Sequence, residues 1–529
     1  APRPTGPRCA RPCPPFPGPF LLPSFSPSSS PPPSLVSSLS APSYPLLPFP
    51  PLPSPLLSSP LRSSHPSPSP SPQYLLLPNA SKTFYRSGGV VTTLNPVSTV
   101  TEISHQLQDS KPRLAVASAE SKEKMLKAKA EVPSIADIIV MLPEGSAAPE
   151  GCHLMSAVLK SGDEEFKGVP VLHSDLAVLP YSSGTTGNPK GVMLTHYNLI
   201  ANCCQNSSML SNELGDENAS LIAFLPFFHI YGMQIFLMCA LNAGAKLCIM
   251  SKFDPTAFLT ILVNHKVTTA FVVPPIVNFM AKHPAVDSVL EQIKPTLRTV
   301  LSGAAPLGKD LGAALEKRLA NGCKVKQGYG MTELSPVTHT TPENLATPAN
   351  CGAAGTLVPN TQMKIVKPDG NLAGLNEPGE ICIRGPQVMK GYLKNREATR
   401  QMIVKGWLHT GDVGYIDEQG LTTVVDRCKE LIKVKGLQVP PAEVEDVLQG
   451  HPAVADVAVI GVPDERAGEL PKAFVVPKDA ANPPSLEDIL EYIRDRLAPY
   501  KAPAYIEIVE AIPKSASGKI LRQKLRTAS

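Results

Sequence analysis

Residues 181–191 read YSSGTTGNPKG, and this stretch decides the fold. A loop so rich in Gly, Ser and Thr can wrap a polyphosphate with backbone N–H groups and hydroxyls. Gly184 and Gly187 permit backbone angles that other residues resist, and Lys190 adds a cation for phosphate charge. The GxxxxGK[ST] spacing of a Walker A loop is absent. Because an apolar run at 176–179 precedes the loop and a helical stretch follows it, we predict a phosphate-binding turn between a buried strand and a helix.

The chain around this loop alternates short β-branched runs with helical stretches. Such alternation predicts parallel α/β layers. The expected strands are 90–93, 114–117, 138–142, 269–273 and 298–302, and the expected helices are 101–109 and 121–128.

The character of the sequence changes after about residue 350. Strands are expected at 362–366 and 380–384, separated by a turn at 368–370, and they predict a smaller β-rich subdomain. From Asp426 onward the pattern mixes helices with short strands, which has the size and character of a separate small α+β domain. Its expected helices are 441–448 and 485–497, and its expected strands are 455–461 and 472–476.

Length and composition exclude several classes of protein. With 529 residues the chain is too long for one hydrophobic core, so two or more domains are expected. A net charge of +4 gives no support to nucleic-acid or membrane-surface binding. The 11 cysteines include no CxxC pair and no zinc spacing, so we expect reduced, mostly buried thiols of an intracellular protein. The most apolar stretch, 221–250, is too interrupted for a membrane span and predicts buried strand and helix.

The first 80 residues differ from the rest. They hold 26 of the 59 prolines, and no acidic residue precedes Glu102, so this leader is expected to be disordered. Two interpretations stay open, an organelle transit peptide and a misread gene model. The chain starts at Ala1 rather than Met, which points to a fragment. The C-terminal sequence RTAS is not a peroxisomal signal, which favours a cytoplasmic protein.

Six further motifs follow the phosphate loop: SGAAP at 302–306, QGYGMTE at 327–333, GEICIRG at 379–385, GWLHTGD at 406–412, DRCKELIKVKGLQ at 426–438 and PKSASGKI at 513–520. Together with the loop, they resemble the signatures of adenylate-forming enzymes, which include acyl-CoA synthetases, firefly-type luciferases and peptide-synthetase adenylation domains. The resemblance is strongest to 4-coumarate–CoA ligase and its ligase-like relatives. It runs from Gly88 to Arg526, with the motifs in the family order.

The resemblance implies an α/β fold in two domains joined by a hinge. The large AMP-binding domain, at 81–425, would contain two α/β subdomains and a β-rich one. The small α+β C-terminal domain would occupy 426–529, and the disordered leader 1–80. The family normally has further ordered α/β structure before Gly88, so we expect the first subdomain to be truncated or replaced at its start.

The resemblance also implies a nucleotide site. Tyr329 would stack on adenine, Thr332 would meet the α-phosphate, and Asp412 would accept hydrogen bonds from both ribose hydroxyls. Glu333 would hold Mg²⁺, a hard cation that prefers carboxylate oxygens. The residues implied to bind ATP or AMP are Ser182, Ser183, Gly184, Thr185, Thr186, Lys190, Gly303, Ala304, Ala305, Gln327, Gly328, Tyr329, Gly330, Thr332, Asp412, Arg427 and Lys429.

The implied chemistry has two half-reactions. An acid displaces pyrophosphate from Mg·ATP to give an acyl-adenylate, and coenzyme A then takes the acyl group. Lys519 matches the catalytic lysine, because a cation over both reacting anions lowers the barrier to their meeting. Between the steps, the small domain would rotate about a hinge near Lys429. Lys433 and Gln438 match positions that assist adenylate formation, and the positions that match the coenzyme A site are Lys252, Lys435 and Gly436.

The acid would lie along 225–232, LPFFHIYG. His229 matches a position at the pocket mouth, and Tyr231 a position in its wall, although a single His among apolar residues is also typical of a protein core. Hydroxycinnamate-using relatives carry a polar residue four positions after the matching Tyr, where this chain has Ile235. An unpaired phenolic hydroxyl costs roughly 1–3 kcal/mol, so we expect a more apolar acid, cinnamate-like or a medium-chain fatty acid.

Several alternatives stay open. A medium- or long-chain fatty acyl-CoA synthetase or a luciferase-like oxygenase would share every ATP motif. A carrier-loading adenylation domain would need a carrier, and none is fused here. An inactive truncated relative is disfavoured by the intact phosphate and lysine motifs. We expect a small carboxylic acid as the partner, and no nucleic acid, no stable membrane insertion and no obligate protein partner. Cys382 is expected to be packed rather than reactive.

Overall fold

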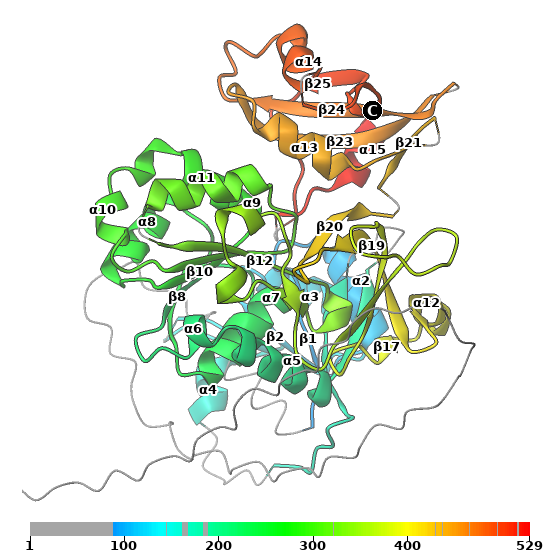
Figure 1. Ribbon diagram of the computed structural model, residues 1–529. Coiled ribbons are helices and arrows are strands. Elements are labelled where there is room, and N and C mark those ends of the chain that lie inside the picture. The colour runs from blue at the N-terminus through cyan, green and yellow to red at the C-terminus, as the bar shows by residue number, and fades with distance from the viewer. Residues whose placement is uncertain are drawn as a thin grey trace, which may run out of the picture. The chain divides into compact units, whose positions relative to one another are not determined.

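The computed structural model describes residues 88–143, 145–160, 168–182, 189–320, 322–428, 430–435, 437–464, 466–494, 496–515 and 518–528 (Figure 1). The predicted disordered leader at 1–80 lies outside the described residues, and Ser183, Gly184, Thr185, Thr186, Lys429 and Gly436 do as well. Within the described ranges, no helix combines the length and hydrophobicity that a membrane crossing needs.

A small parallel sheet opens the described chain. Its strands pair in the order β2 (Leu114–Ser118), β3 (Asp137–Met141) and β4 (Cys152–Leu154). Helices α2 (Val100–Ser110), α3 (Lys122–Glu131) and α4 (Met155–Lys160) accompany it. Helix α2 begins where Thr99 and Glu102 form a capping box, and its Ile103 and Leu107 enter a shared apolar core with Met125 of α3. The predicted alternation of strand and helix is confirmed in this region.

The strands on either side of the predicted phosphate loop lie in another sheet, in the order β1 (Val91–Thr92), β5 (Leu176–Leu179), β7 (Lys190–Thr195) and β17 (Gly391–Tyr392), with β6 (Tyr181–Ser182) also on β7. The sequence predicted a helix directly after the loop, and this was wrong. Strand β7 returns antiparallel to β5 and β6, and helix α5 (His196–Met209) starts only after it, capped by Thr195. The loop therefore joins two paired strands, and Ser182 at its start faces Lys190 at its end.

A seven-stranded sheet forms the largest part of the fold. Its order is β14-β13-β12-β11-β10-β8-β9, with the five strands from β12 to β9 parallel. Helices α9 and α11 lie beside each other over it (Figure 1). The strands are β8 (Ser220–Ala223), β9 (Lys246–Ile249), β10 (Thr269–Val272), β11 (Thr299–Ser302), β12 (Lys324–Gly330), β13 (Val337–Thr340) and β14 (Thr356–Leu357). The helices are α6 (Ser211–Leu214), α8 (Pro255–Asn264), α9 (Pro274–Lys282), α10 (Leu290–Ile293) and α11 (Lys309–Leu319).

The apolar stretch 221–250 folds as predicted, into buried strand and helix. It runs through β8, the short helix α7 (Ile230–Gly232), a π-helical segment (Met233–Ala240) and β9. Phe236 of the π-helical segment packs edge-on against Phe271 of β10 in the main core. This packing places the predicted acid-pocket residues against the sheet that carries the nucleotide motifs.

The β-rich part is antiparallel throughout. Its strands are β15 (Gln362–Val366), β16 (Gly379–Arg384), β18 (Ile403–Val404), β19 (Trp407–Ile416) and β20 (Thr422–Arg427), and α12 (Arg396–Met402) precedes β18. The predicted domain boundary at 425/426 falls inside β20. This strand remains paired with β19 as far as Arg427, whose partner is Asp412, so the break in structure comes after Arg427.

The C-terminal block is a small α+β domain with its own core. Its sheet order is β22-β21-β24-β23, with β25 parallel to β24. Buried side chains such as Val444, Val459 and Ile489 fill the space between sheet and helices. The strands are β21 (Ile432–Val434), β22 (Leu437–Val439), β23 (Val454–Asp464), β24 (Gly468–Pro477) and β25 (Tyr505–Ile508), and the helices are α13 (Pro441–Gln449), α14 (Leu486–Arg494) and α15 (Arg522–Ala528). Short 3₁₀ turns among the described residues are Pro284–Val286, Thr332–Leu334, Glu343–Leu345, Pro348–Asn350 and Pro499–Lys501.

Candidate active site

Three side chains from three strands meet at Asp412. Tyr329, near the end of β12, donates a hydrogen bond to Asp412 Oδ2 over 2.6 Å, and Arg427 Nε lies 3.4 Å from Asp412 Oδ1. Burial raises the pKa of Asp412, and the positive charge of Arg427 opposes that rise. The arrangement is a buried carboxylate between a phenol and a guanidinium, and its oxygens can accept hydrogen bonds from hydroxyl groups.

A second buried carboxylate, Glu333, lies in the turn after β12 and is only 4% exposed. Its Oε1 accepts hydrogen bonds from Ser182 Oγ over 2.9 Å and from Tyr392 OH over 2.8 Å. Lys190 Nζ lies over the ring of the same Tyr392, 5.6 Å from its centroid. Ser182, the last described residue before the centre of the loop, therefore bonds to Glu333. Lys190, just after the loop, lies over the ring of the tyrosine that bonds to the same carboxylate.

The contacts of Glu333 fit a hard divalent cation. In the part of the chain that the structure describes, its hydrogen bonds come from hydroxyls, and none of the ion pairs includes it. The two hydroxyls leave lone pairs of the carboxylate free for a metal ion, and Mg²⁺ prefers such oxygen ligands. These contacts fit the predicted role of Glu333 as a magnesium ligand.

Lys519 lies among these groups, on the segment before α15. Burial lowers the pKa of Lys519 to about 8, with Arg427 adding to the effect and Asp412 opposing it. The preceding Gly518 packs against the end of β10, where a Cβ would lie 3.3 Å from Val273. A lysine in this setting is an ammonium whose charge is poorly solvated, which favours contact with anionic ligands.

His229 is the fourth group of the cluster. Burial lowers the pKa of His229 to about 4, and the charge of Lys519 contributes to this. Its Nδ1 accepts a hydrogen bond from the backbone N–H of Tyr231 over 3.2 Å. A neutral ring that accepts at Nδ1 carries its proton on Nε2, so His229 presents a hydrogen-bond donor there. The structure thus brings together Asp412, Arg427, Lys519 and His229, from motifs far apart in the sequence.

Small residues at the predicted adenine walls have clear steric reasons. Gly303 follows β11 and faces the ring of Tyr231, where a Cβ would lie 3.3 Å from the nearest ring carbon. Ala304 has a φ of 69°, in the left-handed region. A Cβ on Gly330 would overlap the carbonyl oxygen of Pro336. Ala305 lies in the turn after β11, Gly328 lies within β12, and Thr332 begins the 3₁₀ turn that follows it, so small residues recur at both predicted walls.

Gln327, predicted to bind the nucleotide, has a side chain that is bonded within the protein. Its Nε2 donates to the backbone oxygens of Leu307 and Cys351, over 3.1 and 2.6 Å, and its Oε1 accepts the N–H of Leu307 over 3.0 Å. Since every polar atom of the side chain is already bonded, Gln327 supports the turn after β11.

The predicted acid-pocket position Ile235 lies in the π-helical segment and is only 2% exposed. It belongs to the main apolar core together with Phe227 and Phe236. The neighbouring Gln234 is also buried, and its Nε2 donates to the backbone oxygen of Leu199 over 2.9 Å. The surroundings of Ile235 are therefore apolar.

Of the predicted coenzyme A residues, the structure describes Lys252 and Lys435. Lys252 and Lys435 are exposed, and Lys433 is exposed on β21. Gln438 faces Lys433 across the β21–β22 hairpin, and the structure describes only its backbone. Ser183, Gly184, Thr185, Thr186, Lys429 and Gly436 lie outside the described residues, so their predicted roles stay predictions.

Two groups at the site were not singled out by the sequence. Tyr392 lies in a two-residue strand without any motif around it, so only the fold reveals its contact with Glu333. Glu380 and His409 stand inside quoted motifs, and His409 Nδ1 lies 2.8 Å from Glu380 Oε2. An acidic and a basic side chain in two successive motifs could have indicated that these two residues pair.

Cys382 is fully buried as predicted, and burial raises its pKa to about 12.

Comparison with known families covers most of the chain. A family model for AMP-binding enzymes matches residues 83–393, and a model for the C-terminal domain of AMP-binding enzymes matches residues 443–519. The first match contains the loop at 181–191 and the motifs at 302–306, 327–333 and 379–385, and the second contains 513–519 and ends at Lys519. The motifs at 406–412 and 426–438 lie between the two matches.

Individual relatives agree with the family match. The chain is 43% identical over 451 residues to 4-coumarate–CoA ligase 1 of Solanum tuberosum, across 83% of this chain and 79% of the relative. It is 41% identical to 4-coumarate–CoA ligase-like 9 of Oryza sativa subsp. japonica, across 86% and 81%. Among solved structures it resembles ATP-bound MatB from Rhodopseudomonas palustris, with TM-score 0.75, 28% identity and 85% coverage of each chain. It also resembles the anthranilate CoA ligase AuaEII with anthranoyl-AMP, with TM-score 0.74, 26% identity and 83% coverage of each.

Proposed function

The chain belongs to the AMP-binding enzyme family and is an acid–CoA ligase, and from this premise we propose that it activates an apolar carboxylic acid through Lys519. The observation that carries the proposal is the position of Lys519 beside Asp412, Arg427 and His229. Asp412 would bind the ribose end of an adenylate and His229 would lie at the acid end, and the charge of Lys519 acts on both groups.

In the first half-reaction, the ribose hydroxyls of ATP would donate to Asp412, replacing the hydrogen bond from Tyr329. A carboxylate oxygen of the acid attacks the α-phosphorus, a new P–O bond forms, and the bond to the bridging oxygen breaks as pyrophosphate leaves. Both reactants are anions. The Lys519 ammonium would neutralise the charge that builds up on the oxygens around the α-phosphorus, which is where a fixed cation accelerates phosphoryl chemistry most.

Glu333 would hold the Mg²⁺ of the nucleotide, with Ser182 and Tyr392 orienting its carboxylate. Magnesium, when bound, supplies charge neutralisation on the phosphates. Lys190 would add a second positive charge at the end of the phosphate loop. This assignment is supported by the hydroxyl-only surroundings of Glu333 described above.

In the second half-reaction, the sulfur of coenzyme A attacks the acyl carbonyl, a C–S bond forms, the C–O bond to AMP breaks, and the thiol proton passes to solvent. We propose that Lys252, Lys435 and Gly436 serve this step, and that Lys433 and Gln438 assist the first. The exposure of Lys433 and Lys435 supports a rearrangement of the linker after Arg427 between the steps.

The acid is proposed to be apolar along its length. Ile235 supports this, because its surroundings contain apolar side chains and a hydroxyl group buried there would lack a partner. A cinnamate-like acid fits the 4-coumarate–CoA ligase relatives, and a medium-chain fatty acid fits the same apolar wall.

The test is ATP–pyrophosphate exchange by the full chain with hydroxycinnamates, cinnamate and fatty acids. Exchange with an apolar acid that falls at least about 100-fold in Lys519→Ala would support the proposal. Lys524→Ala is a matched control, since Lys524 is an exposed lysine five residues away on α15. Exchange that is unaffected by Lys519→Ala, or better turnover of 4-coumarate than of every apolar acid, would contradict it.

A further inference from the structure

Strand β19, which carries Asp412, does not pair evenly with its neighbour β16. Glu380 of β16 faces Val413 of β19, and Cys382 faces His409. Between these two pairs, β16 has only Ile381 whereas β19 has the three residues 410–412. The surplus residues form a bulge, and Asp412 lies in it. A bulged segment lacks regular ladder bonds, so other groups must fix its shape.

Glu380 supplies one bond to the backbone of the bulge and one to a side chain beside it. Its Oε1 accepts the backbone N–H of Gly411 over 3.1 Å, and its Oε2 lies 2.8 Å from His409 Nδ1. One carboxylate therefore binds the bulge at its start, through His409, and in its middle, through Gly411. Gly411 has a φ of 71°, a conformation in which its N–H points out of the strand ladder and needs a partner elsewhere.

The remaining bonds of the bulge depend on the same conformation. Thr410 Oγ1 donates to the backbone oxygen of Ile381 over 2.8 Å, and it accepts the N–H of Asp412 over 3.1 Å. The carbonyl of Gly411 accepts the N–H of Cys428 over 2.8 Å. Both sides of Gly411 are therefore bonded, one to Glu380 and the other to the residue that follows β20.

We propose that Glu380, oriented by His409, is a positioning residue that shapes the 410–412 bulge and so sets the Asp412 carboxylate for the ribose hydroxyls. The inference rests on the proposed function, because it assumes that Asp412 binds the nucleotide. Glu380 acts through the backbone and touches neither substrate nor reacting atoms.

The effect of Glu380 is geometric rather than electrostatic. Its negative charge would repel, rather than attract, the carboxylate of Asp412. A glutamine can replace both of its bonds, since the amide oxygen accepts from Gly411 and the amide N–H donates to the other tautomer of His409. Glu380→Gln should therefore preserve the bulge, whereas Glu380→Ala should release it.

A metal ion is the competing explanation for this cluster. The ligand atoms of Glu380, Cys382 and His409 all lie within 4.8 Å of one another, and no ion is needed to explain them because His409 Nδ1 bonds to Glu380 and contacts Cys382 Sγ at 3.4 Å. If AMP affinity fell on treatment with a chelator and returned with Zn²⁺, an ion would shape the bulge and the proposal would be overturned.

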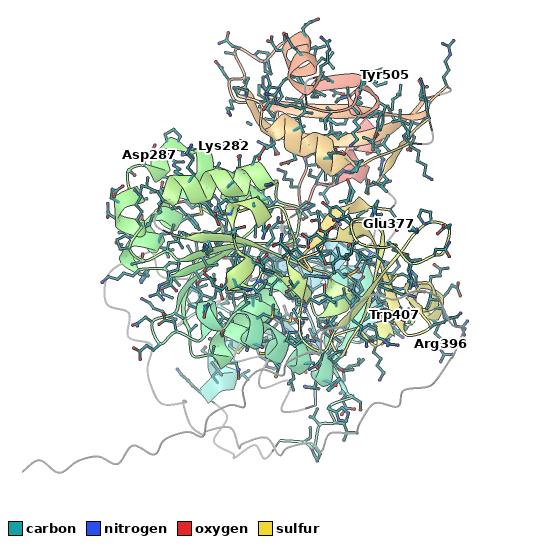
Figure 2. All side chains as sticks on the ribbon, in the orientation of Figure 1. Lys282, Asp287, Glu377, Arg396, Trp407 and Tyr505 are labelled. Carbon is teal, nitrogen blue, oxygen red and sulfur yellow. The ribbon has the colours of Figure 1, made fainter. Side chains whose placement is uncertain are left out.

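The experiment is calorimetric titration of the full chain and its variants with AMP, with a melting curve for each variant. We expect Glu380→Ala to weaken AMP binding about 10-fold or more, and Glu380→Gln to change it less than about threefold. Glu377→Ala is the matched control (Figure 2). This glutamate also accepts a backbone N–H, from Gly374 over 2.8 Å, and pairs with Lys367, but it lies on the turn before β16 and takes no part in the hydrogen bonds described for the 410–412 bulge.

A double-mutant cycle separates positioning from general stability. If Glu380 acts through Asp412, adding Glu380→Ala to Asp412→Ala weakens AMP binding no further. Full additivity, or equal effects of Glu380→Ala and Glu380→Gln, would overturn the proposal. If Glu380→Ala does not fold, His409→Ala replaces it, with an expected loss of about threefold or more, and unchanged binding would overturn the proposal. An unaltered chain that binds no AMP would overturn both this inference and the proposed function.

Discussion

The phenol of Tyr392 donates a hydrogen bond to Glu333 Oε1 over 2.8 Å, while Lys190 Nζ lies 5.6 Å from the centroid of the same ring. One side chain therefore touches the candidate metal carboxylate and the cation at the end of the phosphate loop. Burial raises the pKa of Tyr392, and the charge of Glu333 raises it further, so the phenol remains a donor at neutral pH.

Tyr392→Phe should weaken the use of Mg·ATP without removing activity. The change deletes the donor to Glu333 and keeps the ring under Lys190, so we expect KM for Mg·ATP to rise about three- to tenfold, the worth of one hydrogen bond. Pyrophosphate exchange measured over a range of Mg²⁺ concentrations checks this. Tyr505→Phe is the control, since Tyr505 is half-exposed on β25 (Figure 2). Identical kinetics of Tyr392→Phe and the unaltered chain would contradict the assignment.

The pH profile of adenylation should reveal Lys519. Its folded-state pKa of about 8 is lower than the ordinary 10.5, so the charged, active form is present below that pH and is lost above it. We expect kcat/KM for ATP, in pyrophosphate exchange, to fall as the pH rises through about 8. Lys519→Arg keeps its charge at every pH, so its lower activity should not show this fall. The same alkaline fall in the arginine variant would assign it to another group.

Substitution of Ile235 should change acid preference. Ile235→Ser places a hydroxyl in an apolar wall, so the ratio of kcat/KM for 4-coumarate over cinnamate should rise about 10-fold, because a partner now exists for the phenolic hydroxyl. Ile235→Leu is the control for packing and should leave the ratio unchanged. Melting curves separate a change in preference from loss of core stability. An unchanged ratio in a folded Ile235→Ser variant would place Ile235 outside the acid pocket.

Two glycines provide a test of the backbone at the adenine wall. Gly330→Ala should destabilise the protein by about 3 kcal/mol or more, since its Cβ would overlap the carbonyl oxygen of Pro336. Gly420→Ala, with a φ of 78° and open space around the new methyl, should cost only about 1 kcal/mol of left-handed strain. Chemical denaturation of both variants measures the difference, and equal costs would show that the contact at Gly330 relaxes.

Much of the fold followed from local pattern. Regions with clear alternation, such as the expected strands 114–117 and 138–142, became β2 and β3 within one residue at most ends. The error after the phosphate loop has a physical cause. Residues 190–195, KGVMLT, contain a short apolar run that suits either strand or helix, and only the pairing with β5 and β6 selects the strand.

The site was less predictable than the fold, because its contacts join residues that are distant in sequence. Motifs indicated Asp412 and Tyr329 separately, while their 2.6 Å hydrogen bond spans 83 positions. Gln327 was grouped with ligands by its place in a motif, and only its three bonds show that it supports a turn. Tyr392 lies outside every motif quoted above. A single aromatic residue in a short strand also has no periodicity that could indicate its role.

The hydrogen bond from the Cys428 N–H to the Gly411 carbonyl has a mechanical meaning. It attaches Cys428, the first residue after β20, to the peptide next to Asp412, the carboxylate proposed to bind the ribose. Under the proposed rotation of the C-terminal domain about this linker, a movement of Cys428 would reach Asp412 through this hydrogen bond. Release of AMP would then be coupled to the movement of the smaller domain.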